Sequence, residues 1–228
     1  MRPKHWSWSA LETYETCPRR WWYKYIGRLP DPPGPHLERG RVVHDALELA
    51  LQAKDATVDF GGPWLANQLD LYRSFGAEAE ASYFVDREWS EVAPDPDRHI
   101  PGGTYTMAKL DVYSPREGFF ADWKTGKLTP RNVEKHSQQA KLYATVLMSI
   151  TGRRRLDVDL VYVDHQHVEQ LAFEFDLDEL ERQQAKWDAR ARPLFEATDW
   201  PKKPSKLCDF CPFHVSKGGP CDGRKEKT

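Results

Sequence analysis

The spacing of apolar residues predicts helices over most of the first third of the chain. Residues 9–25 begin with the capping-box sequence Ser9-Ala-Leu-Glu12, and Pro18 interrupts this segment, so two shorter helices are expected. Residues 37–54 place four apolar side chains on one helical face, namely Val43, Leu47, Ala50 and Leu51. His44 lies at the edge of this face. Residues 64–82 follow as a further predicted helix.

Runs rich in aromatic and β-branched residues predict strands in the middle of the chain, at 84–93, 103–113 and 118–124. A helix is expected at 130–151, between Pro130 and Gly152. Two more strands, 156–164 and 168–176, surround a His165-Gln166 turn, and a charged helix covers 178–196. This order predicts an α/β (α+β) fold with a mixed central sheet flanked by helices.

Composition describes an ordinary globular chain of 228 residues, with 39% hydrophobic and 30% charged residues and a formal net charge of −2. No apolar run approaches the roughly 20 residues of a membrane span, and the N-terminus has no apolar signal region, so a cytoplasmic location is expected. The net charge does not indicate a nucleic-acid binder. Basic residues alternate with aromatic ones over 19–28, which suits phosphate and base contacts as well as it suits a solvated helix face.

Two carboxylates and a lysine carry the chemistry predicted for the middle of the chain. Asp122 and Lys124 lie two apart on a predicted strand and project from one face. Asp111 lies at the end of the preceding predicted strand and reaches the same face if the two strands pair as a hairpin. Hard oxygen ligands beside an ammonium group suit a divalent metal and a phosphate together, as in a metal-dependent phosphodiesterase.

Four cysteines are placed unevenly, with Cys17 near the N-terminus and Cys208, Cys211 and Cys221 close to the C-terminus. Disulfides are not expected in a reducing compartment. Four thiolates can hold a zinc ion or an iron–sulfur cluster, and spacing alone does not separate the two. A shared centre would tie the chain ends together and stabilise the fold by several kcal/mol in entropic models.

Five features now stand in order along the chain: Gly40-Arg-Val-Val-His44, Asp111, Asp122-Trp-Lys124-Thr-Gly126, Gln139-Ala-Lys-Leu-Tyr143 and the cysteines. Together they resemble the PD-(D/E)XK nuclease superfamily, and more closely its RecB-like exonuclease branch with an iron–sulfur staple. That branch includes the CRISPR-associated exonucleases and the AddB nuclease domain. The resemblance spans Ser7 to Cys221 and implies a restriction-endonuclease-like core.

The resemblance also implies a role for each matching residue. His44, Asp111, Asp122 and the backbone carbonyl of Trp123 would bind Mg²⁺ or Mn²⁺, and Lys124 would position the attacking water. Gln139 and Tyr143 would contribute to the site and to DNA contacts. A [4Fe–4S] cluster, with Zn²⁺ as the alternative, would be held by Cys17, Cys208, Cys211 and Cys221.

The predicted function is therefore exonuclease activity at DNA ends, with a single-strand preference, in recombination, repair, phage DNA metabolism or CRISPR adaptation. The alternative is a non-catalytic DNA-binding or scaffold protein with a structural four-cysteine centre. One nuclease domain over 1–228 is expected, in which 1–36 and 200–228 form a cysteine lobe around a 37–199 core. Proteins of recombination or CRISPR adaptation are candidate partners in a bacterial, archaeal or phage setting. Oligomeric state and polarity of digestion are open at this stage.

Overall fold

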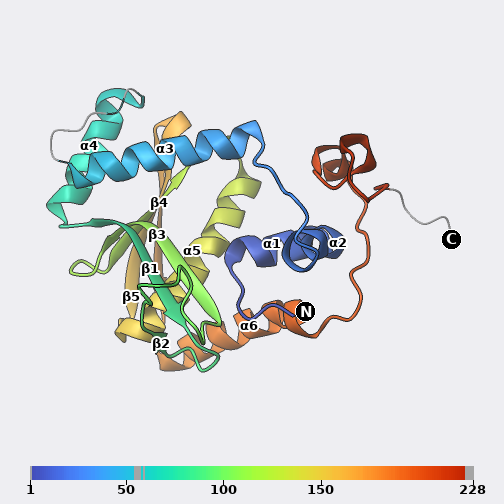
Figure 1. The fold of residues 1–228 in the computed structure, drawn as a ribbon. Helices are drawn as coiled ribbons and strands as arrows, with labels where there is room; N and C mark the ends of the chain where they lie inside the picture. Colours follow the sequence, from blue (N-terminus) through green and yellow to red (C-terminus); the bar gives the residue numbers. More distant parts are fainter. Residues whose placement is uncertain (1, 54–57, 59, 224–228) are drawn as a thin grey trace. The chain divides into compact units, whose positions relative to one another are not determined.

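The computed structural model describes residues 2–53, 58 and 60–223. The chain divides into two compact units, Met1–Pro33 with Ala185–Thr228, and Gly34–Gln184. We call them the terminal unit and the sheet unit. Figure 1 shows the course of the chain through both. Lys54, the last residue of the helix predicted over 37–54, lies outside the described residues.

The sheet unit is built on a mixed six-stranded sheet of order β2-β1-β3-β4-β5-β6. Its strands are β1 (Glu78–Val85), β2 (Glu91–Val92), β3 (Thr106–Ser114), β4 (Phe119–Lys124), β5 (Arg155–Tyr162) and β6 (His167–Glu174). Strands β4 and β5 are parallel, whereas every other neighbouring pair is antiparallel. The predicted mixed sheet flanked by helices is therefore confirmed.

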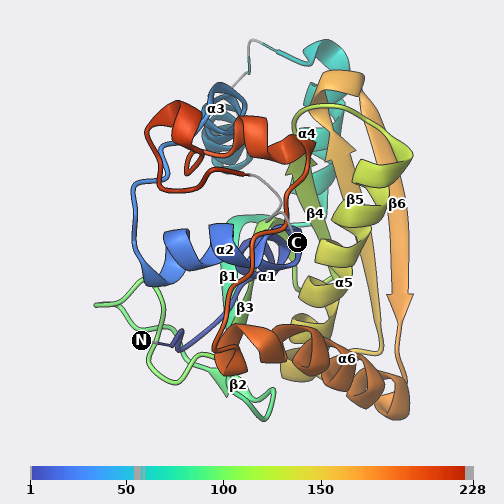
Figure 2. The same cartoon turned by 90° about the vertical axis from the view of Figure 1, so that its right-hand side faces the viewer.

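Three helices complete the sheet unit: α3 (Pro35–Gln52), α4 (Gly62–Ser74) and α5 (Pro130–Thr151). Helix α5 is the crossover that parallel strands β4 and β5 require, and it packs against β3 and β5 (Figure 2). Thr129 caps its start by accepting a hydrogen bond from the Asn132 N–H at 3.2 Å. Gly152 ends it in a left-handed conformation, as the sequence predicts.

Strand β4 is buried along its whole length because helices cover both of its faces. Ala121 and Trp123 join an apolar core with residues of α3 and α4, among them Leu47 and Leu65. Since strand side chains alternate, Asp122 and Lys124 project from the opposite face, which α5 covers. The fold therefore directs the charged pair of this strand toward α5.

The chain departs from prediction after α4, where the helix expected over 64–82 ends at Ser74 and β1 already begins at Glu78. Gly76 follows the helix with φ +63°, a left-handed conformation that stops helical hydrogen bonding. The alanines and glutamates that follow favour a helix, but pairing with β3 overrides this local preference. The strand predicted over 84–93 is in fact the end of β1 and the short β2.

The terminal unit begins with α1 (Trp8–Thr16) and α2 (Pro18–Trp21), which continues as a π-helical turn at Trp22–Ile26. The predicted break at Pro18 is confirmed, and Cys17 before it is extended. The predicted cap was wrong, because Ser7 rather than Ser9 accepts the hydrogen bond from the Ala10 N–H, at 3.4 Å.

The rest of this unit comes from the C-terminal part of α6 (Leu177–Glu196) and two short 3-10 turns, Lys206–Phe210 and Val215–Lys217. Trp8 packs edge-on against Trp187, with ring centroids 6.3 Å apart. The guanidinium of Arg190 stacks 4.7 Å from the Trp187 ring and pairs with Glu15. None of the helices in the described residues is long and apolar enough to span a membrane.

The two leucines of α3 that flank Glu48 provide a matched test of the core. Leu47 is fully buried, whereas Leu49 is 64% exposed. Leu47→Ala should lower the free energy of unfolding by about 3 kcal/mol, because it removes buried methyl groups and leaves a cavity. Leu49→Ala should change it by less than about 0.5 kcal/mol. Urea denaturation of both variants measures the difference, and equal losses would contradict this packing of α3.

Candidate functional site

The residues predicted for phosphodiester chemistry gather in the sheet unit, from four elements. Asp111 lies on β3, Asp122 and Lys124 on β4, Gln139 on α5 and His44 on α3. The antiparallel register pairs Val112 with Ala121, so Asp111 comes beside Asp122 on the neighbouring strand. The hairpin anticipated from the sequence is therefore present, and it brings both carboxyl groups to one face.

Asp111 is held by contacts with His44 and with the backbone of Trp123. Its Oδ1 lies 3.2 Å from His44 Nδ1, and its Oδ2 accepts the Trp123 backbone N–H at 2.8 Å. Burial tends to raise the pKa of Asp111, but hydrogen bonding and the charge of His44 hold the pKa below its ordinary value. Burial likewise tends to lower the pKa of His44, and Asp111 outweighs it and raises the pKa. The two groups favour an ionised pair.

Asp122 and Lys124 form an ion pair that is buried from solvent. Burial raises the pKa of Asp122, the neighbouring charge of Asp111 adds to the rise, and Lys124 opposes it. The opposite pKa shifts make Asp111 the stronger acid of the two carboxyl groups. The Asp122 Oδ2 atom lies against Lys124 Nζ, yet it makes no hydrogen bond with the described residues.

Helix α5 supplies the remaining contacts of the lysine. Lys124 Nζ donates to Gln139 Oε1 at 2.8 Å, and Gln139 Nε2 donates to the Tyr143 hydroxyl at 3.0 Å. Gln139 and Tyr143 are four apart and share a helix face, as predicted. Burial raises the pKa of Tyr143, and the charge of Asp122 raises it further, so the hydroxyl stays protonated. Contacts with Asp122 on β4 and with Gln139 on α5 therefore fix the Lys124 side chain.

A divalent ion fits the donors of this site, although the donors do not converge in the present arrangement. Carboxylate oxygens and an imidazole suit Mg²⁺ or Mn²⁺, and Asp122 Oδ2 is a buried oxygen still without a hydrogen bond. Within the described residues, no three histidine, cysteine or acidic side chains are grouped closely enough to hold a metal ion. Trp123, predicted to ligate through its carbonyl, lies in the β4–β5 ladder opposite Val161.

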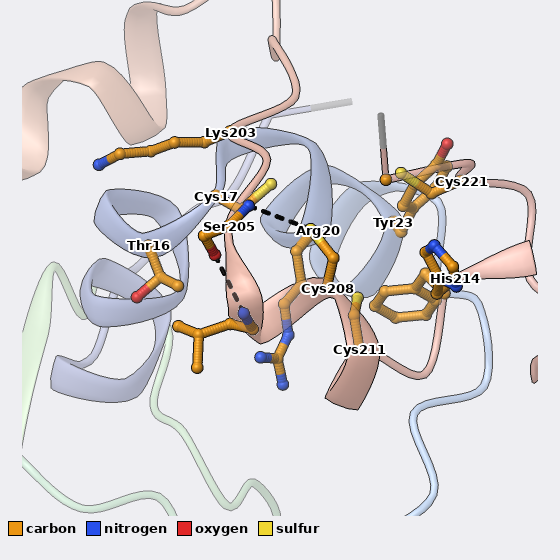
Figure 3. Close-up of a pocket in the computed structure, with 13 residues that line it drawn as sticks. Thr16, Cys17, Arg20, Tyr23, Lys203, Ser205, Cys208, Cys211, His214 and Cys221 are labelled. Carbon is orange, nitrogen blue, oxygen red and sulfur yellow. Dashed lines mark hydrogen bonds between the residues drawn. The ribbon is translucent and has the colours of Figure 1, made fainter. Parts of the chain in front are cut away.

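The four cysteines line one pocket of the terminal unit, shown in Figure 3. The pocket has a volume of about 40 Å³, more than a single water requires. Each of the four is a free thiol and partly buried. The structure thus brings Cys17 to the same pocket as the three cysteines near the C-terminus, without grouping them at metal-binding distance.

The thiols are close enough to influence one another. Burial raises the pKa of Cys211, and Cys221 and Cys17 raise it further, whereas the charge of Arg20 lowers it. Arg20 also lines the pocket, and its Nε is buried without a hydrogen bond. The balance of these effects raises the pKa of the Cys211 thiol, and Arg20 is the nearby cation that opposes the rise.

Sequence reasoning missed a loop restraint beside Lys124. Arg39 of α3 pairs with Asp164 through both guanidinium nitrogens, and Asp164 Oδ2 also accepts the Gly126 N–H at 2.8 Å. His165 Nε2 lies 2.9 Å from the Gly126 carbonyl oxygen. Gly126 has φ +102°, so the turn after Lys124 needs glycine. These residues are far apart in sequence, and no local pattern links them.

Sequence reasoning also missed His136 and Tyr162. His136 Nδ1 lies 3.0 Å from the Tyr162 hydroxyl, between α5 and β5. Burial lowers the pKa of His136 to about 3, helped by the charges of Lys124 and Lys135. The spacing of His136 from Gln139, three residues on one helix, was the available indication.

Comparison with known proteins identifies the class. A sequence profile described as the PD-(D/E)XK nuclease superfamily matches residues 5–216, which is most of the chain. The chain belongs to this superfamily. No curated protein matches its sequence.

Two solved structures are similar to the chain. SSO0001 superposes with a TM-score of 0.51 at 16% sequence identity, over 99% of this chain and 90% of that one. A phage-related exonuclease from Haemophilus somnus 129PT has a TM-score of 0.37 at 13% identity, over 83% of this chain and 92% of that one. The first similarity indicates a shared fold, and the second is too loose to indicate more.

Burial of neutral His136 should make stability depend on pH. The folded-state pKa is about 3, below the unfolded value, so between these pH values the unfolded chain binds more protons at this residue. Stability is therefore lost as the pH falls through the unfolded pKa. Between pH 7.5 and 5, wild type should lose about 1 kcal/mol more than His136→Gln, allowing for partial exposure.

Urea denaturation at the two pH values measures this difference. His99→Gln changes a histidine in an exposed loop and is the matched control. It should follow wild type at both pH values. Identical pH dependence in wild type and His136→Gln would contradict a buried neutral imidazole.

Proposed function

We propose that this protein is a metal-dependent DNA exonuclease that hydrolyses phosphodiester bonds at DNA ends and prefers single-stranded DNA. The observation that carries the proposal is the buried Asp122–Lys124 pair, with Asp111 beside it and Gln139 fixing the lysine. A buried lysine paired with a carboxylate has little structural advantage over apolar residues. Its presence is best explained by chemistry at the site.

In this proposal, His44, Asp111 and Asp122 hold the catalytic divalent ion, with the Trp123 carbonyl as a further ligand. When bound, such an ion polarises a phosphoryl oxygen and lowers the pKa of a water. Both carboxyl groups must be ionised to serve as ligands, and the contact with His44 favours this form of Asp111.

Lys124 neutralises charge at the scissile phosphate and orients the attacking water in the proposed reaction. Its Nζ is within hydrogen-bond distance of Gln139 and lies against Asp122, so it can donate to a third group without moving its stem. Holding a donor in place before the substrate arrives is what lowers the cost of reaching the transition state. Gln139 and Tyr143 position the lysine and contact the DNA strand.

The end preference rests on the motifs rather than on the shape of the site. Two motifs resemble those of the RecB-like exonuclease branch: His44 upstream of the acidic residues, and the Gln139-Ala-Lys-Leu-Tyr143 sequence. Recombination, repair, phage DNA metabolism and CRISPR adaptation are the settings in which that branch acts. The competing hypothesis is a non-catalytic DNA-binding or scaffold protein. The intact set Asp111, Asp122 and Lys124 argues against it.

The direct test is cleavage of end-labelled single-stranded DNA with Mg²⁺ or Mn²⁺. Lys124→Ala should lower the cleavage rate at least about 100-fold, because it removes a preorganised donor at the reacting phosphate. Lys141→Ala is the matched control: this lysine lies on α5 near the Phe175 ring, and its variant should cut like wild type. Equal cleavage by wild type and Lys124→Ala would refute the nuclease assignment. Binding without cleavage by wild type would favour the scaffold hypothesis.

We propose further that Cys17, Cys208, Cys211 and Cys221 ligate a [4Fe–4S] cluster, with Zn²⁺ as the alternative. The support is their position around one pocket and the cation of Arg20 beside them. Because the ligands come from both ends of the chain, the centre would act as a staple between segments about 190 residues apart. It has no part in the proposed hydrolysis.

Anaerobic purification followed by metal analysis tests the cluster. A brown protein with equal amounts of iron and acid-labile sulfide is expected, whereas a colourless protein with zinc would select the alternative. Cys208→Ala should lower the free energy of unfolding by several kcal/mol while the cleavage rate of the folded protein changes little. Lys206→Ala, an exposed neighbour, is the control and should retain stability. Unchanged stability in Cys208→Ala would exclude a staple.

A further inference from the structure

His136 forms a second link between α5 and the sheet, one helical turn before Gln139. Its Nδ1 lies 3.0 Å from the Tyr162 hydroxyl, and the two rings have centroids 5.7 Å apart. Tyr162 is the register partner of Lys124 in the parallel β4–β5 pair. The Tyr162–His136 and Lys124–Gln139 hydrogen bonds are therefore neighbouring links from the same sheet face to the same helix face.

The direction of the Tyr162–His136 hydrogen bond follows from the burial of the phenol. Burial raises the pKa of Tyr162 to about 12, so the phenol keeps its proton. Tyr162 is 1% exposed and its hydroxyl has no other hydrogen-bond partner among the described residues, so this proton is donated to His136 Nδ1. Burial lowers the pKa of His136 to about 3, so the imidazole is neutral. Since Nδ1 accepts, the single ring proton resides on Nε2. Tyr162 thus selects the tautomer of His136.

Among the described residues, none accepts a hydrogen bond from the Nε2–H of His136. This nitrogen is also not one of the buried polar atoms without a partner, so solvent reaches it. The charge of Lys124 acts on His136, and the charge of Asp122 acts on Tyr162. The pair therefore lies within electrostatic range of the proposed reaction centre.

We propose that His136 is a substrate-positioning residue whose Nε2–H donates to a non-bridging phosphate oxygen of the DNA strand held at Lys124. This inference rests on the proposed nuclease function. A phosphate oxygen is the expected acceptor because Lys124 attracts an anion to this face and every nucleotide carries one. A neutral donor adds a hydrogen bond without another positive charge beside the lysine. The hydrogen bond therefore orients the bound DNA strand in addition to strengthening its binding.

Affinity and turnover, measured separately, test the proposal. Binding of fluorescent single-stranded DNA is followed by anisotropy with Ca²⁺ in place of Mg²⁺, and cleavage is followed with Mg²⁺. His136→Ala should raise both Kd and KM about tenfold, the typical effect of losing a hydrogen bond to a charged group. Its kcat should stay within about twofold of that of wild type, because the contact is made equally in the enzyme–substrate complex and in the transition state.

Three further variants separate the proposed role from packing. His136→Gln keeps an N–H donor near the same position and should restore most of the affinity. Tyr162→Phe leaves the tautomer of His136 unselected and should raise Kd less than His136→Ala does. His99→Ala removes an exposed loop histidine and should bind like wild type. Should His136→Ala fail to fold, the Kd values of His136→Gln and Tyr162→Phe are compared with that of wild type. A larger rise in Kd for Tyr162→Phe than for His136→Gln supports the proposed role, and no rise in either contradicts it.

Salt dependence distinguishes a neutral donor from a cation. The slope of log affinity against log salt should be the same for wild type and His136→Ala, whereas losing a cationic contact to single-stranded DNA lowers it by about 0.7. A changed slope, an unchanged Kd and KM, or a fall in kcat alone would each overturn the assignment. Wild type that cuts no DNA would refute the nuclease function itself, a result separate from any of these.

Discussion

The buried charges of β4 impose the arrangement of everything around them. Asp122 and Lys124 project from a strand covered on both faces, and each is less than one-tenth exposed. Charges that are removed from water are tolerated only when hydrogen bonds and opposite charges replace their lost hydration. Gln139 from α5 and Asp111 from β3 provide these partners, and His44 from α3 in turn holds Asp111. Three other elements, α5, β3 and, through Asp111, α3, are therefore tied to this strand.

The β4–α5–β5 crossover supplies most of these partners as a consequence of topology. Parallel neighbours require a long connection, and α5 returns over the sheet face from which Lys124 projects. Residues on one side of α5 then meet β4 and β5 in turn: Gln139 reaches Lys124, and His136 reaches Tyr162. The same helix thus fixes the lysine and presents an additional donor.

Sequence patterns predicted which side chains of the candidate site share a face better than they predicted the boundaries of the fold. Asp122 and Lys124 follow the two-residue period of a strand, and Gln139 and Tyr143 follow the helical period, so their shared faces were accessible without coordinates. The helix predicted over 64–82 was wrong beyond Ser74, since alanine and glutamate favour a helix locally while pairing with β3 is a tertiary effect. The Arg39–Asp164 pair joins residues 125 apart and has no local pattern at all.

That distant pair bears on how rigidly the site is held. Asp164 accepts from both Arg39 and the Gly126 N–H, so the turn after Lys124 is anchored to α3 and to the end of β5 at once. An exposed ion pair alone contributes little to stability. Here its effect is geometric, because the backbone that leaves Lys124 has few conformations left when both contacts are made. In the proposed reaction, a lysine fixed by Gln139 on one side and by an anchored turn on the other is preorganised for a phosphate, and Arg39 and Asp164 contribute to this without touching the substrate.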